Sequence, residues 1–133
     1  MATKNIYLNW NPEQEFTLRD NKDHQIIMKD NVSASDMLPM ALIGCSSHDV
    51  VSILRKQKQD LHELKVTADA IQDEDPPWRF RKIHIHYQVI GKGLDPEKVG
   101  RAILLSEEKY CSVYATLRDA VEITNDFKVV EAE

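Results

Sequence analysis

The feature that most constrains the fold is a long apolar segment in the first half of the chain. Residues 33–60 are predicted to form a helix that Ser33 or Ser35 can cap. From Met37 to Leu54 the side chains are apolar nearly all round this helix, so we expect a buried central helix. Its longest nearly unbroken apolar run, Met37–Cys45, is half of the roughly 18 residues that a membrane-spanning helix needs. The segment therefore predicts a core helix and no membrane partner.

The rest of the composition fits a single globular domain over residues 1–133. Of the 133 residues, 42% are hydrophobic and 29% are charged, which is enough to bury a core without disulfides or metals. The formal net charge is −5 and no basic stripe occurs, so no nucleic-acid partner is expected. The first ten residues, MATKNIYLNW, lack the apolar stretch of a secretion signal, so we predict a cytoplasmic protein.

Short strands joined by turns are predicted before the central helix. Ile6, Leu8 and Trp10 alternate with polar residues, and a third strand is expected over Gln25–Lys29. This opening segment, residues 1–30, has few large apolar side chains, and an isolated hairpin is only marginally stable in water. We therefore expect another surface to cover it.

Further strands and a second helix are predicted after the central helix. Residues 63–70 and 82–89 alternate between apolar and polar, which indicates two strands with one buried and one wet face. A helical period then runs from Val99 to Leu117. The segment from Val121 to Val129 is expected to be a closing hairpin with its turn at Asn125-Asp126. The predicted fold class is α+β, with antiparallel sheets around the buried central helix.

Residues that could bind a metal or a cofactor are few. His84 and His86 share one face of their predicted strand, and Cys45 with His48 could be imagined as two further zinc ligands. No closely spaced cysteine pair strengthens this hypothesis, and histidines on the wet side of a strand are more often simply solvent-facing. Residues 46–49 include serine, histidine and aspartate, but neighbours in sequence cannot form a hydrolase triad. Four scattered glycines do not make a phosphate loop, so we predict no metal and no organic cofactor.

Two cysteines, Cys45 and Cys111, are the remaining candidates for chemistry. In a reducing compartment a permanent disulfide is not expected, and the simplest alternative is that both are small buried side chains. Their contexts, MALIGCSSHDVVSIL and LSEEKYCSVYATL, together resemble those of the OsmC/Ohr family of thiol-dependent peroxidases. The resemblance covers essentially the whole chain and is strongest to the YhfA-type branch of small OsmC-like proteins.

The resemblance implies an assembly and a reaction. Family members are intertwined homodimers, so residues 1–30 are expected to complete the sheet of a partner subunit. By match of motif, Cys45 takes the peroxidatic role and Cys111 the resolving role in reducing organic hydroperoxides, as part of oxidative-stress defence. The resemblance also implies an external dithiol reductant, and Arg19 best matches the arginine of the family's N-terminal hairpin. Where the family has a glutamate before the cysteine helix, Ser35-Asp36 stands in this sequence, which nominates Asp36.

The chemistry of a buried thiol agrees with these roles. Burial in an apolar helix raises a thiol pKa, so a reactive Cys45 requires a compensating cation. The start of the helix is almost three turns away, too far for its dipole to act, and Arg19 oriented by Asp36 is the better candidate. Met37 and Met40 are expected to wall the substrate pocket. The alternative function is an OsmC-fold binding protein for a small apolar ligand, with little or no peroxidase turnover.

Overall fold

The computed structural model describes residues 1–28 and 32–133. These residues form two compact units, Met1–Leu38 and Pro39–Glu133, each with its own sheet. Lys29, the predicted end of the third strand, lies outside the described residues. That the two units together act as one domain stays a prediction.

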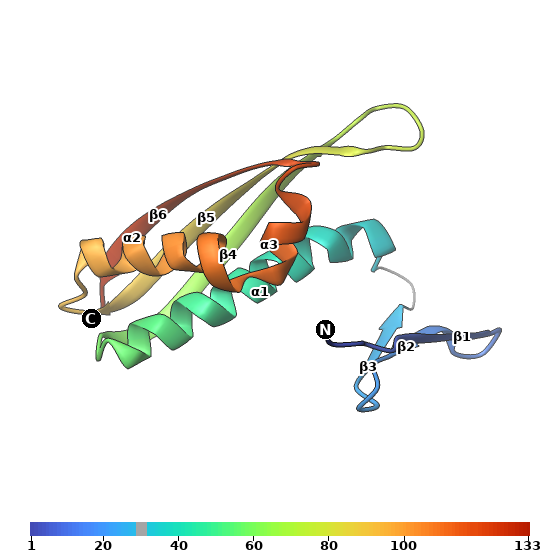
Figure 1. Cartoon of the computed structure of the whole chain (residues 1–133), viewed down its shortest axis with the longest axis horizontal. Helices are drawn as coiled ribbons and strands as arrows, with labels where there is room; N and C mark the ends of the chain where they lie inside the picture. Colours follow the sequence, from blue (N-terminus) through green and yellow to red (C-terminus); the bar gives the residue numbers. More distant parts are fainter. Residues whose placement is uncertain (29–31) are drawn as a thin grey trace. The chain divides into compact units, whose positions relative to one another are not determined.

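The first unit contains an antiparallel sheet in the order β1-β2-β3, drawn in shades of blue in Figure 1. Its strands are β1 (Tyr7–Asn11), β2 (Glu15–Arg19) and β3 (Gln25–Met28). Polar side chains shape both turns: Asn11 Oδ1 accepts the backbone N–H groups of Glu13 and Gln14 at 3.1 and 2.7 Å. Asp20 Oδ1 accepts two backbone N–H groups in the second turn. The predicted short strands and turns are confirmed.

Most apolar side chains of this first sheet are exposed within the chain. Trp10 is 56% exposed and Ile27 is 55% exposed. The same is true of Ile6, Tyr7, Leu8, Phe16 and Ile26. The sheet therefore buries little apolar surface of its own, and its strands need a second surface for stability.

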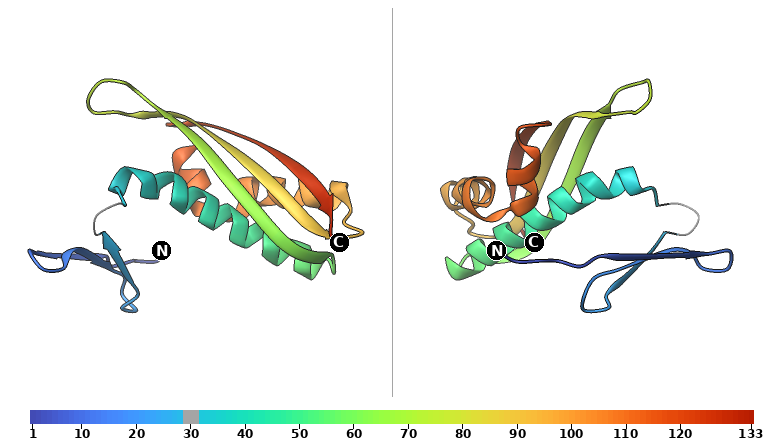
Figure 2. Two further views of the ribbon diagram at one scale, coloured as in Figure 1. Left: turned by 180° about the vertical axis from the view of Figure 1, so that it is seen from behind. Right: turned by 45° about the vertical axis from the view of Figure 1, so that its right-hand side comes forward.

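The second unit is a three-stranded sheet with helices on one side, as both views in Figure 2 show. Its elements in chain order are α1 (Ala34–Lys56, which begins in the first unit), β4 (Asp60–Gln72), β5 (Phe80–Lys92), α2 (Pro96–Leu105), a π-helical turn η1 (Ser106–Tyr110), α3 (Ser112–Leu117) and β6 (Glu122–Glu131). The sheet order is β4-β5-β6, so β5 is the central strand. Two sheets with packed helices confirm the α+β class.

The core lies between the helices and the inward face of β5. Ile83, Ile85, Tyr87 and Val89 alternate with polar residues along this strand and are at most 1% exposed. They belong to one cluster with side chains of α1 and α2, namely Leu42, Val50, Leu54, Val99, Ala102 and Ile103. Burial of each large apolar side chain contributes about 1.5–3 kcal/mol, which holds both helices against the sheet.

Helix α1 begins where the sequence predicts and ends at Lys56 rather than Asp60. Ser33 Oγ accepts the Asp36 backbone N–H at 3.2 Å, so Ser33 acts as the cap. Within the chain only one face of α1 is fully buried, formed by Leu42, Ser46, Val50 and Leu54. By length and composition alone α1 also qualifies as a membrane span. The core helix of a globular domain meets the same criterion, and the buried face of α1 packs into the core cluster of the second unit.

The last strand corrects the predicted closing hairpin. β6 is one continuous strand parallel to β5, with Lys82 opposite Glu122. Asn125 and Asp126, the predicted turn, lie inside this strand. The connection through α2 and α3 crosses over the sheet and returns the chain to the same end, so parallel pairing forms without a tight turn. The second sheet is therefore mixed rather than wholly antiparallel.

A break at Cys111 corrects the predicted second helix, which does not reach Leu117 in one piece. The turn η1 closes with a hydrogen bond from the Cys111 N–H to the Ser106 carbonyl oxygen at 2.7 Å. Cys111 itself is extended (φ −82°, ψ 102°), and its Sγ caps α3 by accepting the Tyr114 N–H at 3.3 Å. The apolar stripe continues on both sides of the break, so its period does not locate the interruption.

Candidate functional site

The two cysteines meet inside the second unit. The Sγ atoms of Cys45 and Cys111 and a carboxylate oxygen of Asp49 all lie within 4.8 Å of one another. Cys45 and Asp49 are one turn apart on α1, and Cys111 approaches from the break between η1 and α3. Both thiols are free; Cys111 is buried and Cys45 is partly exposed. A disulfide holds its sulfurs about 2.05 Å apart, so bond formation requires a small local shift.

The surroundings of Cys45 favour its thiolate. Burial is the largest influence and acts to raise the pKa of Cys45. Hydrogen bonds from the Val113 N–H, the Cys111 thiol and the Ser112 hydroxyl act in the opposite direction. Together they outweigh burial and the negative charge of Asp49, and the pKa of Cys45 lies below its ordinary value. The start of α3 therefore supplies the donors that activate Cys45.

Cys111 shows the opposite behaviour. Burial, followed by its hydrogen bond with Cys45, raises the pKa of Cys111 to about 11. At neutral pH Cys111 therefore remains a protonated thiol that donates to Cys45, and Cys45 is the stronger nucleophile of the two. This difference is a physical basis for two separate roles.

Asp49 has a buried partner that the sequence does not reveal. Its Oδ2 accepts a hydrogen bond from the Ser106 hydroxyl at 2.9 Å, which fixes the carboxylate beside the thiols. Ser106 is 0% exposed although it stands in the apolar stripe of the second predicted helix. A serine within an apolar stripe is a signal that could have identified this position, because buried hydroxyls need a hydrogen-bond partner.

A second buried hydrogen bond lies near the thiols. The Tyr87 hydroxyl donates to Ser46 Oγ at 3.0 Å and so connects β5 to the residue next to Cys45. Burial raises the pKa of Tyr87 to about 12, although the hydrogen bond with Ser46 acts to lower it. Tyr87 therefore remains a neutral phenol and serves to hold α1 in position.

The cation predicted for Cys45 is not among its main influences. Burial and four neighbouring groups dominate the pKa of Cys45, and none of those four groups is a cation. Arg19 belongs to the first unit, where its Nη1 lies 3.1 Å from Asp23 Oδ1 and its guanidinium lies 5.3 Å from the centre of the Tyr7 ring. Asp36, its predicted partner, donates its backbone N–H to Ser33. The roles of Arg19 and Asp36 at Cys45 stay predictions.

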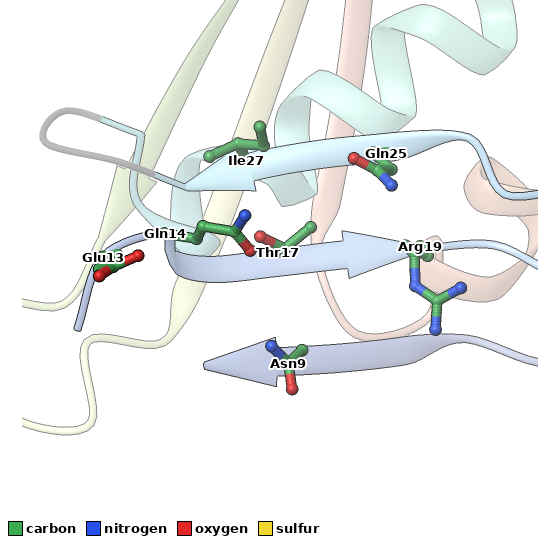
Figure 3. Close-up of a pocket in the computed structure, with 7 residues that line it drawn as sticks. All are labelled: Asn9, Glu13, Gln14, Thr17, Arg19, Gln25 and Ile27. Atoms are coloured by element: carbon green, nitrogen blue, oxygen red, sulfur yellow. The ribbon is translucent and has the colours of Figure 1, made fainter. Parts of the chain in front are cut away.

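Arg19 also lines a hollow in the first unit. Figure 3 shows this hollow of about 530 Å³, whose side chains come from all three strands and from the turn between β1 and β2. The lining residues are Asn9, Glu13, Gln14, Thr17, Arg19, Gln25 and Ile27. Most of these residues are polar and uncharged, and Arg19 is the one cation among them.

Arg19 also lines a smaller, more apolar hollow of the first unit. It has a volume of about 250 Å³, and Met37 lines it together with Ile6, Leu18 and Ile26. Met37 is thus placed in a cavity wall, whereas Met40 is 54% exposed on α1. Contact of either methionine with a substrate stays a prediction.

The thiol pair could also hold a metal ion, since two sulfurs and a carboxylate converge. His48, the imagined fourth ligand, is exposed and does not belong to this cluster. What the cluster offers chemically is a partly exposed thiolate at Cys45 and a buried thiol beside it. Such a pair can attack an electrophilic oxygen and then close to a disulfide.

Comparisons with known proteins identify the family. Residues 28–126 match the family model described as OsmC-like protein. The chain is 43% identical over 114 residues to Protein YhfA of Escherichia coli (strain K12), which covers 82% of this chain and 85% of that protein. A hypothetical protein from Aquifex aeolicus VF5 is 25% identical, with a TM-score of 0.87 over 100% of both chains.

A further likeness concerns the fold alone. The organic hydroperoxide resistance protein OhrB of Bacillus subtilis is 16% identical, with a TM-score of 0.59 over 96% of this chain and 98% of that chain. The segment that matches the family model contains both Cys45 and Cys111. By this match and by its identity to YhfA, the chain belongs to the family of OsmC-like proteins.

Proposed function

We propose that this protein is a thiol-dependent peroxidase that reduces organic hydroperoxides, with Cys45 as the attacking residue and Cys111 as the resolving residue. The observation that carries the proposal is the pair of sulfurs within 4.8 Å of each other. The pKa of Cys45 is lowered although burial acts to raise it. The pKa of Cys111 is raised to about 11, chiefly by burial. Membership of the OsmC-like family supports a role in the response to peroxides.

The reaction proceeds in two steps on these residues. The Cys45 thiolate attacks the terminal oxygen of the hydroperoxide, the O–O bond breaks, and a Cys45 sulfenic acid and an alcohol form once the leaving oxygen takes up a proton. The Cys111 thiol then condenses with the sulfenic acid, which yields the disulfide and water. An external dithiol reduces the disulfide and restores both thiols.

The proposal includes a homodimer in the cytoplasm. The exposed apolar side chains of β1, β2 and β3 support an assembly in which a second copy covers this sheet. In that assembly Arg19 of one subunit stabilises the Cys45 thiolate of the other, and Asp36 orients the Arg19 guanidinium.

Single substitutions of the cysteines test the proposal. Cys45→Ser should abolish the consumption of cumene hydroperoxide, because the nucleophile is gone. Cys111→Ser should permit one turnover and leave Cys45 as a sulfenic acid that mass spectrometry detects after trapping. His48→Ala, an exposed change on the same helix, is the control and should turn over as the unmodified protein does. Sulfenylation of Cys111 in Cys45→Ser, at an unchanged rate, would reverse the two roles.

The Met37 hollow favours a second candidate, a binding protein for a small apolar ligand. A titration of the reduced protein separates the two functions. The peroxidase loses two thiols per hydroperoxide and gains one intramolecular disulfide, whereas a binding protein loses no thiols.

A further inference from the structure

The outer face of the second sheet carries a cluster of imidazoles and carboxylates that the thiol chemistry does not use. His84 and His86 alternate along β5 with Ile83, Ile85 and Tyr87, whose side chains face the core. The two imidazoles therefore project from the face opposite the helices. Their side chains are 33% and 42% exposed, so both are accessible from solvent.

A single carboxylate from the neighbouring strand joins the two rings. Asp126 Oδ2 lies 3.1 Å from His84 Nε2, and Asp126 Oδ1 contacts His86 Nδ1. This arrangement depends on the parallel register of β5 and β6, which places Asp126 directly beside His86. A hairpin turn at Asn125-Asp126 does not bring them together, so the sequence alone does not identify Asp126 as a partner of His84 and His86.

A fourth residue, a second carboxylate, lies on the other neighbouring strand. Asp69 of β4 is the register partner of His84, and residues directly opposite in an antiparallel pair present their side chains on the same face. Asp69 is exposed, whereas Ala68 and Val66 beside it are partly buried against the core. Asp69 therefore shares the outer face with His84.

The position of His84 is further fixed by Thr124. His84 Nδ1 lies 2.7 Å from Thr124 Oγ1, and the same ring directs Nε2 at Asp126. When Nδ1 carries the proton and donates to the hydroxyl, Nε2 presents a lone pair toward a carboxylate oxygen. A proton or a metal ion must then lie between these two acceptors. A hydrogen bond to the non-ligating nitrogen is how proteins orient histidine ligands.

We propose that His84, His86 and Asp126, with Asp69 as the fourth ligand, bind a Zn²⁺ ion on the outer face of the second sheet. Two imidazoles and two carboxylates are a donor set that suits Zn²⁺ in tetrahedral geometry. The two rings now contact different oxygens of Asp126, so chelation requires the partly exposed rings to turn toward one point. The nearby cation Lys82 is engaged by Glu122 at 3.9 Å.

Such an ion would link all three strands of the sheet. Its ligands come from β4, β5 and β6, and it binds the folded chain alone, so it stabilises the sheet by mass action. At a Zn²⁺ concentration about 100 times the Kd, we expect Tm to rise by roughly 5–10 °C.

The test uses the full chain with both cysteines replaced, Cys45→Ser/Cys111→Ser, because two sulfurs and a carboxylate converge at the thiol cluster and form a competing zinc site. Calorimetric titration of this variant with Zn²⁺ should give one saturable equivalent. His84→Ala and His86→Ala should each weaken Kd at least tenfold, and Thr124→Val should weaken it about tenfold through loss of ring orientation. His62→Ala is the matched control, since His62 also contacts a carboxylate, Asp60 Oδ1 at 3.2 Å, and should leave Kd unchanged.

A second measurement requires no histidine substitution. Co²⁺ in the same double-cysteine variant should give visible absorption bands typical of tetrahedral nitrogen and oxygen ligands. Loss of all zinc binding on replacement of the cysteines would place the ion at the thiols and overturn the proposal. Binding that survives both histidine changes, or a Co²⁺ spectrum like that of the ion in buffer, would also overturn it.

Discussion

The two three-stranded sheets of this molecule differ in what covers them. Both have apolar residues that alternate with polar ones, yet Trp10 in the first sheet is 56% exposed, whereas Tyr87 in the second is 0% exposed. Helices lie on one side of the β4-β5-β6 sheet, as Figure 1 shows, and their side chains bury its inner face. The comparison teaches that alternation predicts a strand but does not tell whether a partner surface exists for its apolar face.

This difference has a thermodynamic consequence for each unit. The second unit should owe its stability to packing within the chain, because its core cluster is complete there. The first unit should owe its stability to association, because its apolar side chains are covered only when another surface arrives.

The largest expected effect is the loss of a core side chain in the second unit. Leu54 is 0% exposed, so Leu54→Ala should lower the free energy of unfolding by about 2–5 kcal/mol, measured in urea at several protein concentrations. Leu104, which is 48% exposed, is the control, and Leu104→Ala should change stability far less. Equal losses in the two variants would contradict the assignment of the core.

The next effect concerns the first sheet and its partner. Trp10→Ala should weaken self-association by roughly 30-fold, a loss of about 2 kcal/mol, because exposed aromatic residues often anchor interfaces. Sedimentation velocity over a dilution series measures this, with the exposed change Glu13→Ala as the control. A stable folded monomer of the unmodified protein at low micromolar concentration would contradict the proposed dimer.

A smaller effect is expected from the buried hydroxyl beside the thiols. Ser106→Ala removes the 2.9 Å hydrogen bond to Asp49 and should lower the free energy of unfolding by about 1–2 kcal/mol. Thr116→Ala removes a hydroxyl from an exposed hydrogen bond on α3 and should have little effect in the same denaturation experiment. If both changes are neutral, the Asp49–Ser106 pair does not stabilise the site.

The smallest expected effect is that of the Tyr87 hydroxyl, and it depends on pH. Tyr87→Phe should lower the free energy of unfolding by about 1 kcal/mol at neutral pH, because it removes the hydrogen bond to Ser46. Burial raises the pKa of Tyr87 to about 12, whereas the pKa of tyrosine in the unfolded chain is about 10. The contribution of the neutral Tyr87 phenol to the free energy of unfolding is therefore complete below pH 10 and is lost as pH rises toward 12.

Urea unfolding of the reduced protein between pH 8 and 11 checks this dependence. The unmodified protein should lose stability steeply above pH 10, and Tyr87→Phe should lose less over the same interval. The remaining loss is expected from Cys111, whose pKa is also raised, to about 11, chiefly by burial. Tyr110→Phe, at a 59% exposed position, is the control and should follow the unmodified protein.

Much of the fold follows from local patterns, and the exceptions have physical causes. Period and capping correctly predict α1, β4 and β5, because their side chains meet one continuous core. The sequence predicts a hairpin at β6 because Asn125-Asp126 is a dipeptide typical of turns. In the structure the long crossover brings β6 parallel to β5, and this pairing is hidden in the sequence because the two strands are far apart along the chain. The same register unites His84, His86 and Asp126, which is why that cluster has no sequence signature.

The candidate site was predictable in part. The resemblance of two short motifs paired Cys45 with Cys111, and their sulfurs do lie close together. The donors that lower the pKa of Cys45 against the effect of burial include a backbone N–H and the Ser112 hydroxyl, which depend on the break before α3. A continuous helical period gives no indication of such a break, so these groups could not be found from the sequence.

The parallel pairing of β5 and β6 also sets an order for the folding of the chain. The hairpin β4–β5 joins strands that are adjacent in sequence and can form early, whereas β6 must wait until the whole crossover has been closed. Cys111 lies on that crossover, so we expect it to reach its place beside Cys45 late in folding. A nascent or partly unfolded chain then lacks both the resolving thiol and the donors that lower the pKa of Cys45, and we expect its Cys45 to react slowly with peroxide. Peroxide reactivity would thereby be confined to chains that have finished folding.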